Sequence, residues 1–357
     1  MSGTVFWNAD WFPGWLLGGV VIVVGAVLLA RLARQVKRRA VRAASEESTV
    51  LQPAAPNRAA VRDAAEKPAV EPLPALIGRY RIEKRLGRGA MGEVFLGRDA
   101  DTGQLAAIKT LALAQEFAPD ELAEVRARFF REAETAGRLL HQNIVAILDS
   151  GEDGDLAFIA MEYLAGTDLR PFTRPSQLLP LPQVASVVAR IADALAYAHS
   201  SNVVHRDVKP ANVMYDQAGD EVRVMDFGIA RITDSSRTKT GMVLGTPSYM
   251  SPEQLLGRKV DGRSDLYSLG VMLYQMACGQ LPFVGQSMGQ LMLRIANEAC
   301  PDVRAANPQV PEALAAVIER AMRKDAAQRF QTGDEMARAL RACFAADTET
   351  GIEQPGR

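Results

Sequence analysis

The chain has 357 residues, of which 48% are hydrophobic and 23% charged, so its length allows one large domain or two medium ones. Its formal net charge of −1 gives no sign of a protein that holds nucleic acid through bulk basic charge. The three cysteines and three histidines show no pairing or ligand spacing, which excludes a disulfide framework and a zinc site and suits a reducing compartment.

Residues 11–30 carry no charge, and as a helix these twenty residues would be about 30 Å long, the thickness of a bilayer core. Interfacial aromatic residues surround the start of this stretch: Trp7, Trp11, Phe12 and Trp15. Six lysines and arginines follow within residues 31–42, whereas residues 1–10 have none. The positive-inside rule therefore predicts a transmembrane helix over residues 11–30 of a single-pass protein in the plasma (inner) membrane, with the N-terminus outside.

Two other readings of this segment stay open. A cleaved signal peptide normally carries its positive charge before the apolar stretch, and here the charge follows it. A core helix of a soluble domain is rarely apolar on every face for twenty residues.

Gly14 and Gly18 form a Gly-x-x-x-Gly pair that could let two membrane helices pack closely, so a homodimer also stays open.

Residues 31–77 are expected to be a basic juxtamembrane segment and an Ala/Pro-rich linker, because their prolines would break any long helix. A flexible chain of this kind spans roughly 30–35 Å on average and would let the next domain reach substrates near the membrane. A folded domain is expected over residues 78–345, followed by a flexible tail over residues 346–357.

A glycine-rich turn joins the first two strand-like stretches of this domain, at Gly87, Gly89 and Gly92. Glycines at this spacing let the backbone fold over a triphosphate without a Cβ clash. The same pattern marks dinucleotide-binding folds, but there a helix follows, whereas residues 92–98 continue as a strand. A third expected strand, over residues 105–110, carries Lys109.

The segment His205–Asn212, with the sequence HRDVKPAN, is the strongest functional motif. Phosphoryl transfer needs a carboxylate that orients the acceptor hydroxyl and takes its proton, and Asp207 fits that role. Lys209 can neutralise the γ-phosphate. Asn212 and Asp226, fourteen residues apart, can offer Mg²⁺ the oxygen ligands it prefers.

These motifs, with GTPSYMSPE at residues 245–253, resemble in order those of serine/threonine protein kinases. Residues 223–232, 245–257 and 323–330 resemble bacterial kinases of the eukaryotic-like (Hanks) type. The resemblance covers residues 78–343, about three quarters of the chain. It implies an α+β, bilobal kinase fold, with a β-rich N-lobe, a helical C-lobe and ATP in the cleft between them.

The resemblance also assigns roles within the catalytic machinery. Glu132 is expected to pair with Lys109, with Glu134 as its rival, and Thr246 to contact Asp207 and Lys209. Two contacts are expected to be structural: Glu253 with Arg329, and Asp265 with the backbone of the catalytic loop.

For ATP, the resemblance makes Met161 the residue that gates the adenine pocket. The backbone of Glu162 and Leu164 would hydrogen-bond the adenine ring, which would be sandwiched by Val94, Ala107 and Met214. The full set of expected ATP-binding residues is Leu86, Gly87, Gly89, Gly92, Val94, Ala107, Lys109, Met161, Glu162, Leu164 and Met214.

Activation by phosphorylation is a further expectation from the resemblance. Thr238 and Thr240 would be autophosphorylation sites, and Arg206 would join a basic pocket that receives a phosphate and orders the loop. The competing interpretation is that hydroxyl side chains are simply frequent in exposed loops.

The sequence thus predicts a kinase that transfers the γ-phosphoryl group of ATP, with Mg²⁺ or Mn²⁺, to serine and threonine hydroxyls of protein substrates. Nucleic acid is not an expected partner. The alternative is a membrane-tethered pseudokinase scaffold, which usually lacks one of five residues that are all present here: Lys109, Glu132, Asp207, Asn212 and Asp226. A P-loop enzyme is disfavoured because no Gly-Lys-Ser/Thr follows the glycine turn.

Overall fold

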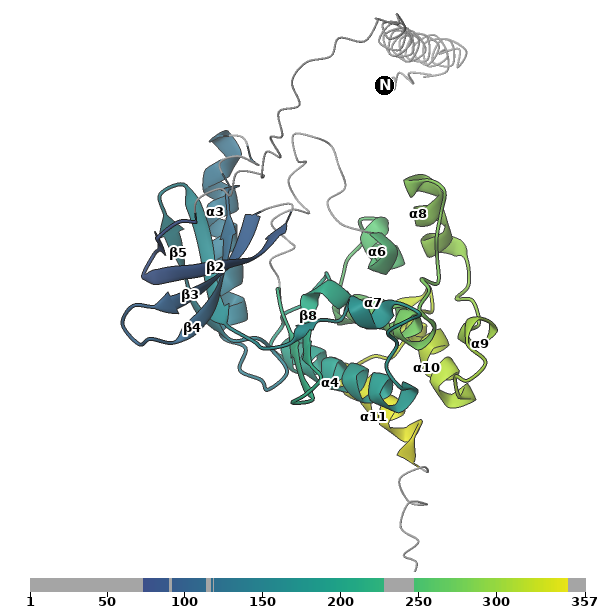
Figure 1. Cartoon of the computed structure of the whole chain (residues 1–357). Helices are drawn as coiled ribbons and strands as arrows, with labels where there is room; N and C mark the ends of the chain where they lie inside the picture. Colours follow the sequence, from purple (N-terminus) through teal and green to yellow (C-terminus); the bar gives the residue numbers. More distant parts are fainter. Residues whose placement is uncertain (1–72, 90–91, 114–116, 118, 228–246, 346–357) are drawn as a thin grey trace, which may run out of the picture. The chain divides into compact units, whose positions relative to one another are not determined.

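The computed structural model describes residues 73–89, 92–113, 117, 119–227 and 247–345 (Figure 1). The predicted membrane segment, nearly all of the predicted linker and the predicted tail lie outside these residues. Within the described ranges, no helix has both the length and the apolar character needed to cross a bilayer.

The N-terminal part of the domain is an antiparallel sheet with one long helix, α3 (Pro119–Gly137) (Figure 1). The strand order in the sheet is β1-β2-β3-β4-β6-β5. The strands are β1 (Leu76–Ile77), β2 (Tyr80–Gly89), β3 (Gly92–Asp99), β4 (Leu105–Leu111), β5 (Ile147–Asp153) and β6 (Leu156–Glu162). The expected strands on either side of the glycine turn are therefore confirmed.

The folded domain begins slightly earlier than the predicted boundary at residue 78. Strand β1 pairs with β2, and Ile77 is buried against the sheet. Tyr80 lies beside it in the same apolar cluster. The last two residues of the predicted linker therefore belong to the sheet, because their backbone pairs with β2 and the side chain of Ile77 is buried.

Residue alternation along β4 explains how the N-lobe presents Lys109. Ala106, Ile108 and Thr110 are buried, whereas Ala107 and Lys109 are more exposed, as the two-residue period of a strand requires. The sheet therefore fixes the direction of Lys109 by packing its neighbours.

Helix α3 packs through residues at helical spacing, Val125, Phe129, Ala133 and Ala136. The first three join one apolar cluster with Ile159 of β6 and other N-lobe residues. Full burial of a side chain such as Phe129 stabilises the fold by roughly 2–3 kcal/mol. This packing decides which face of α3 turns away from the sheet.

The C-lobe is mainly helical, and its helices α4 and α11 lie side by side (Figure 1). The apolar residues of α4 from Val184 to Leu195 are buried. Helix α7 is buried along nearly its whole length and ends at Gly279, whose φ of 77° suits a helix C-terminus. The helices are α4 (Leu181–Ser200), α6 (Pro252–Leu255), α7 (Gly262–Cys278), α8 (Met288–Asn297), α9 (Val303–Ala306), α10 (Glu312–Ala321) and α11 (Gly333–Ala342).

A small three-stranded sheet lies on the C-lobe, in the order β7-β8-β9, and its strands β8 and β9 fall between Asn212 and Asp226 in the chain. Its strands are β7 (Thr167–Asp168), β8 (Val213–Asp216) and β9 (Glu221–Val224). Val224 exchanges backbone hydrogen bonds with Asn143 and Val145, which follow α3 in the chain. These bonds join the segment after α3 to the C-lobe sheet, and the predicted bilobal architecture is confirmed.

Candidate active site

The catalytic loop lies between α4 and β8, and its side chains converge on Asp207. Lys209 Nζ donates to Asp207 Oδ2 over 2.6 Å. Asn212 Nδ2 donates to the same oxygen over 2.9 Å and to the Asp207 carbonyl oxygen over 2.8 Å. Three residues of the predicted motif thus form one hydrogen-bonded group around a partly exposed carboxylate.

Asp265 of α7 holds the backbone of this loop. Its carboxylate is 1% exposed and accepts hydrogen bonds from the backbone N–H groups of His205 and Arg206, over 2.8 and 2.7 Å. Arg206 needs this support, because its φ of 67° is a left-handed conformation that non-glycine residues rarely adopt. The predicted structural role of Asp265 is confirmed. His199 Nε2 lies 2.8 Å from the same carboxylate, a contact that was not predicted.

His205 connects the catalytic loop to the segment that carries Asp226. Its Nδ1 accepts from the Asp207 N–H over 3.2 Å, and its Nε2 lies 2.8 Å from the Met225 carbonyl oxygen. These partners require the neutral tautomer with the proton on Nε2. The ring also lies 4.7 Å from that of Phe227. His205 therefore aligns two segments that are both needed for the expected chemistry.

Asp226 forms an ion pair with Lys109 of β4, with 2.8 Å between Nζ and Oδ2. Burial raises the pKa of this carboxyl, but the Lys109 ammonium outweighs it and leaves the pKa below its usual value. Asp226 is therefore a partly buried, ionised carboxylate. Its φ of 61° is a second left-handed conformation at the site.

A divalent metal fits the donors that Asp226 and Asn212 provide. The side-chain amide N–H of Asn212 donates to Asp207, which leaves the side-chain oxygen of Asn212 for another partner. Among the described residues, no cluster of three or more His, Cys, Asp or Glu side chains could hold a metal. A Mg²⁺ ion here would take its other oxygens from phosphate and water, which is how Mg²⁺ usually binds to proteins.

Glu132 does not pair with Lys109 in this structure, contrary to the expectation. The Lys109 ammonium contacts Asp226 instead. Glu132 turns toward the catalytic loop, because the packing of α3 sets the direction of that face. Its rival Glu134 is exposed and pairs with Arg138 on the same helix. In this structure the ion-pair partner of Lys109 is therefore Asp226.

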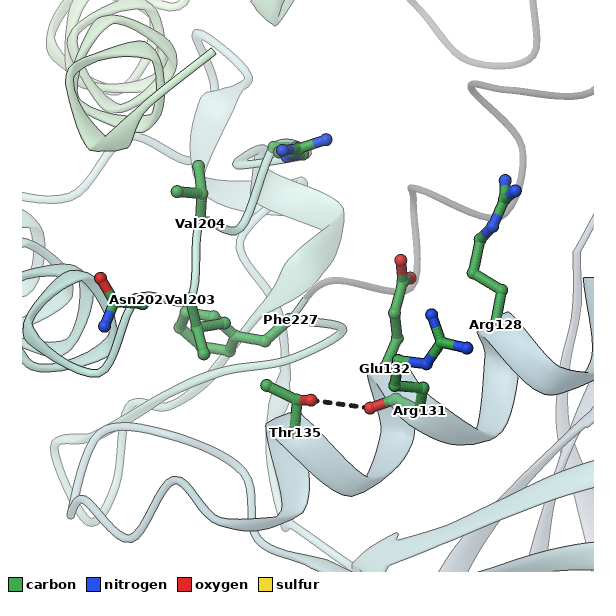
Figure 2. Close-up of a pocket in the computed structure, with 9 residues that line it drawn as sticks. Arg128, Arg131, Glu132, Thr135, Asn202, Val203, Val204 and Phe227 are labelled. Atoms are coloured by element: carbon green, nitrogen blue, oxygen red, sulfur yellow. Dashed lines mark hydrogen bonds between the residues drawn. The ribbon is translucent and has the colours of Figure 1, made fainter. Parts of the chain in front are cut away.

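Glu132 lines a pocket of about 210 Å³ between α3 and the catalytic loop. Figure 2 shows Glu132 and Thr135 on the α3 side, with Phe227 on the other side. One Glu132 carboxylate oxygen is buried. The residues around the pocket are Arg128, Arg131, Glu132, Thr135, Asn202, Val203, Val204, Arg206 and Phe227.

Most of the expected adenine-binding residues lie on the N-lobe sheet or on β8, and Leu164 follows β6. Val94 is directly opposite Lys109 in the β3–β4 pairing, and Ala107 is opposite Met161 in the β4–β6 pairing. Met161 is buried and lines a small cavity behind the site with Phe227 and others. Leu164 packs on the N-lobe cluster and Met214 lies on β8. Their contacts with adenine stay a prediction.

Glu162, at the end of β6, has its side chain occupied. Its Oε1 accepts from the Ala146 N–H over 2.9 Å, and its own N–H donates to the Ala146 carbonyl oxygen over 3.0 Å. The side chain is thus used to fix the connection between the lobes. The prediction assigns the backbone of Glu162, not this side chain, to adenine.

Gly92 is required by close packing in the glycine-rich turn. A Cβ at Gly92 would lie 1.8 Å from the carbonyl oxygen of Thr110 in β4. At Gly87, by contrast, a Cβ would meet nothing within 4 Å. Leu86 is exposed and, with Gly87 and Gly89, belongs to β2.

Several predicted residues lie outside the described ranges. They are the activation-loop threonines Thr238 and Thr240 and the expected catalytic residue Thr246.

The predicted pair between Glu253 and Arg329 is confirmed as a bidentate ion pair, with distances of 2.7 and 2.8 Å. The Arg329 side chain is fully buried. Burial raises the pKa of Glu253, but hydrogen bonds from Arg329 and Ser264 lower it to about 2. The pair fixes α6 to the last part of the domain.

The contacts of Ser251 and Gln254 at α6 were not predicted. Ser251 is the N-cap of this helix and forms a capping box with Gln254. The pattern Ser-x-x-Gln is a known signal for a helix N-terminus and could have been found at residues 251–254. No sequence signal could have revealed that Gln254 also reaches the catalytic loop.

Comparison with known proteins agrees with this geometry. Residues 80–341 match the family model of the protein kinase domain, and the chain belongs to that family. In structure the chain is similar to Rad53 in complex with AMP-PNP, with a TM-score of 0.61 and 23% identity over 74% of this chain and 65% of that one. This likeness supports the fold.

In sequence the chain is similar to serine/threonine-protein kinases of bacteria. It is 36% identical to PrkC of Bacillus subtilis over 76% of this chain and 41% of the relative. It is 40% identical to pkn3 of Myxococcus xanthus, over 74% of this chain and 50% of the relative. It is also 40% identical to PknB of Mycobacterium leprae, over 74% of this chain and 42% of the relative. The chain therefore spans half or less of the length of these relatives.

Proposed function

We propose that the protein is an active serine/threonine protein kinase, which transfers the γ-phosphoryl group of ATP to hydroxyl groups of protein substrates. The observation that carries this proposal is the arrangement around Asp207, whose carboxylate is held by Lys209 and Asn212 near the ionised Asp226. The named kinase relatives support the same activity.

In this proposal Asp207 accepts the proton of the acceptor hydroxyl as the phosphoryl group is transferred. Lys209, at 2.6 Å from Asp207, also lies where it can neutralise charge on the transferred group. Asp226 and Asn212 would hold Mg²⁺, which when bound neutralises charge on the phosphates. Lys109 would then leave Asp226 to bind the α- and β-phosphates and pair with Glu132.

The test uses residues 71–357, which form a compact unit of the chain. This fragment is incubated with radiolabelled ATP and Mg²⁺, with and without a basic acceptor protein, beside an Asp207→Asn control. We expect label on serine or threonine that disappears in the control. Mapping the labelled residues also tests Thr238 and Thr240 as autophosphorylation sites. Nucleotide binding without any label would favour the pseudokinase scaffold.

We further propose that residues 11–30 anchor the protein in the plasma (inner) membrane, with the kinase domain in the cytoplasm. The support is the uncharged stretch followed by six basic residues. The full chain should then stay in the membrane fraction after an alkaline carbonate wash, whereas a chain lacking residues 1–30 should be released. Equal release of both chains would refute the anchor. Gly14 and Gly18 are where two such helices could pack as a homodimer.

A further inference from the structure

One peptide unit of the catalytic loop, between Arg206 and Asp207, is held at both of its polar ends. Gln254 Nε2 of α6 donates to the Arg206 carbonyl oxygen over 2.8 Å. The Asp207 N–H donates to His205 Nδ1 over 3.2 Å. Because a peptide unit is planar, fixing its C=O and N–H fixes the orientation from which the Asp207 side chain starts.

The orientation of the Gln254 amide follows from its partners. Its Oε1 accepts from the Ser251 backbone N–H and from the Ser251 hydroxyl, each over 3.0 Å. A flipped amide would place an N–H group against the Ser251 N–H, and an oxygen against the Arg206 carbonyl oxygen. Only one orientation therefore satisfies both neighbours.

Helix α6 is a firm base for this contact. Ser251 is fully buried, and Glu253 is tied to the buried Arg329 and to the hydroxyl of Ser264 at 2.6 Å. Ser264 lies on α7, which also carries Asp265. The backbone of Arg206 is thus attached to the α6–α7 framework on both sides, through its N–H by Asp265 and through its C=O by Gln254.

We propose that Gln254 is a positioning residue for phosphoryl transfer. It holds the Arg206–Asp207 peptide unit, and with it the left-handed backbone of Arg206, in the orientation that aims the Asp207 carboxylate. This inference rests on the proposed kinase activity. Arg206 has a φ of 67°, a conformation that persists only when its surroundings impose it. A displacement of a catalytic group by about 1 Å can lower a rate about a hundredfold.

The competing explanation is that Gln254 serves α6 alone, as the end of a capping box. Gln254→Glu separates the two, because a carboxylate still accepts from Ser251 but cannot donate to the Arg206 carbonyl oxygen. Ser251→Ala does the reverse, since it removes the capping hydroxyl but leaves the Gln254 amide beside Arg206. Gln254→Met, of similar length, removes both contacts and shows whether the negative charge introduced by Gln254→Glu matters.

The experiment uses the full chain with Mg²⁺ and ATP and an acceptor protein, and measures kcat, the KM for ATP and the melting temperature of each variant. For Gln254→Glu at neutral pH we expect kcat to fall by about ten- to a hundredfold, with the KM for ATP and the melting temperature little changed. Gln254→Met should lose kcat similarly. Ser251→Ala should lower the melting temperature by a few degrees and keep kcat within about twofold of wild type.

The pH dependence of kcat is a further measurement, which a purely structural role of Gln254 would leave unchanged. Once protonated, the carboxyl group that Gln254→Glu introduces can donate to the Arg206 carbonyl oxygen again, so the ratio of variant to wild-type kcat should rise as pH falls. The inference would be overturned if Gln254→Glu kept the kcat of the wild type. It would also be overturned if the loss of kcat followed the loss of melting temperature in all three variants. A wild-type chain as inactive as Asp207→Asn would instead refute the proposed function.

Discussion

Left-handed backbone at Arg206 and Asp226 shows how single residues shape this site. Neither is a glycine: Arg206 precedes the proposed base Asp207, and Asp226 is itself a proposed Mg²⁺ ligand. The backbone of Arg206 is held by hydrogen bonds from Asp265 and Gln254, whereas Lys109 holds Asp226 through its side chain. Strain of about 1–3 kcal/mol at such residues is tolerated because the surroundings fix them.

Gly92 gives a prediction at this scale. Gly92→Ala should lower the free energy of unfolding by about 2 kcal/mol, because its Cβ would meet the Thr110 carbonyl oxygen and push β3 from β4. Gly87→Ala has open space around its Cβ and should leave stability unchanged or raise it slightly. Urea unfolding of both variants checks this, and equal stability of the two would contradict the packing argument.

At the scale of elements, α3 decides which charged residues meet. Its apolar face packs on the sheet, and this sets Glu132 toward the pocket and Glu134 toward solvent. Lys109 and Asp226 meet because β4 and the segment after β9 bring them within 2.8 Å. Formation of the expected Lys109–Glu132 pair therefore requires a shift of α3 or of these side chains.

Glu132 and Glu134 of α3 provide a matched test of this view. Glu132→Gln should lower kcat/KM by about ten- to a hundredfold, because the variant cannot form the charged pair with Lys109 that holds the phosphates. Glu134→Gln should stay within about twofold of wild type, since Glu134 makes an exposed pair with Arg138 on its own helix. Steady-state kinetics decide between them, and equal losses would remove the special role of Glu132.

At the scale of the folded domain, the ion pair between Glu253 and Arg329 joins segments 76 residues apart in the sequence. It links α6 to the segment before α11. The hydroxyl of Ser264 connects Glu253 to α7, the helix that supports the catalytic loop. A buried guanidinium that loses its carboxylate is costly, which makes this pair a point on which the C-lobe depends.

The pKa of Glu253, about 2 against an ordinary 4.5, predicts a pH dependence of stability. A carboxyl with a lowered pKa stabilises the fold fully above 4.5, and this contribution is lost as pH falls from 4.5 toward 2. The wild type should exceed Glu253→Gln by about 3 kcal/mol near pH 7, and the difference should shrink in that acid range. Urea unfolding of both proteins from pH 7 to 3 measures it, and a constant difference would contradict the assignment.

The sequence by itself determined the residues of the catalytic loop, because their chemistry depends on short spacing within His205–Asn212. It also determined the strands around the glycine turn, since strand alternation is a local property. The Glu253–Arg329 and Asp265 contacts followed from family resemblance, and the structure confirms both.

Only the tertiary structure decided which distant groups touch. The Lys109–Asp226 pair, the direction of Glu132 and the bond from Gln254 to Arg206 join residues on separate elements. Gln254 and Arg206 are 48 positions apart, and their contact depends on how α6 packs on α7. Local spacing fixes the direction of a side chain on its own element, but the distance between two elements is set by the packing of all the residues between them.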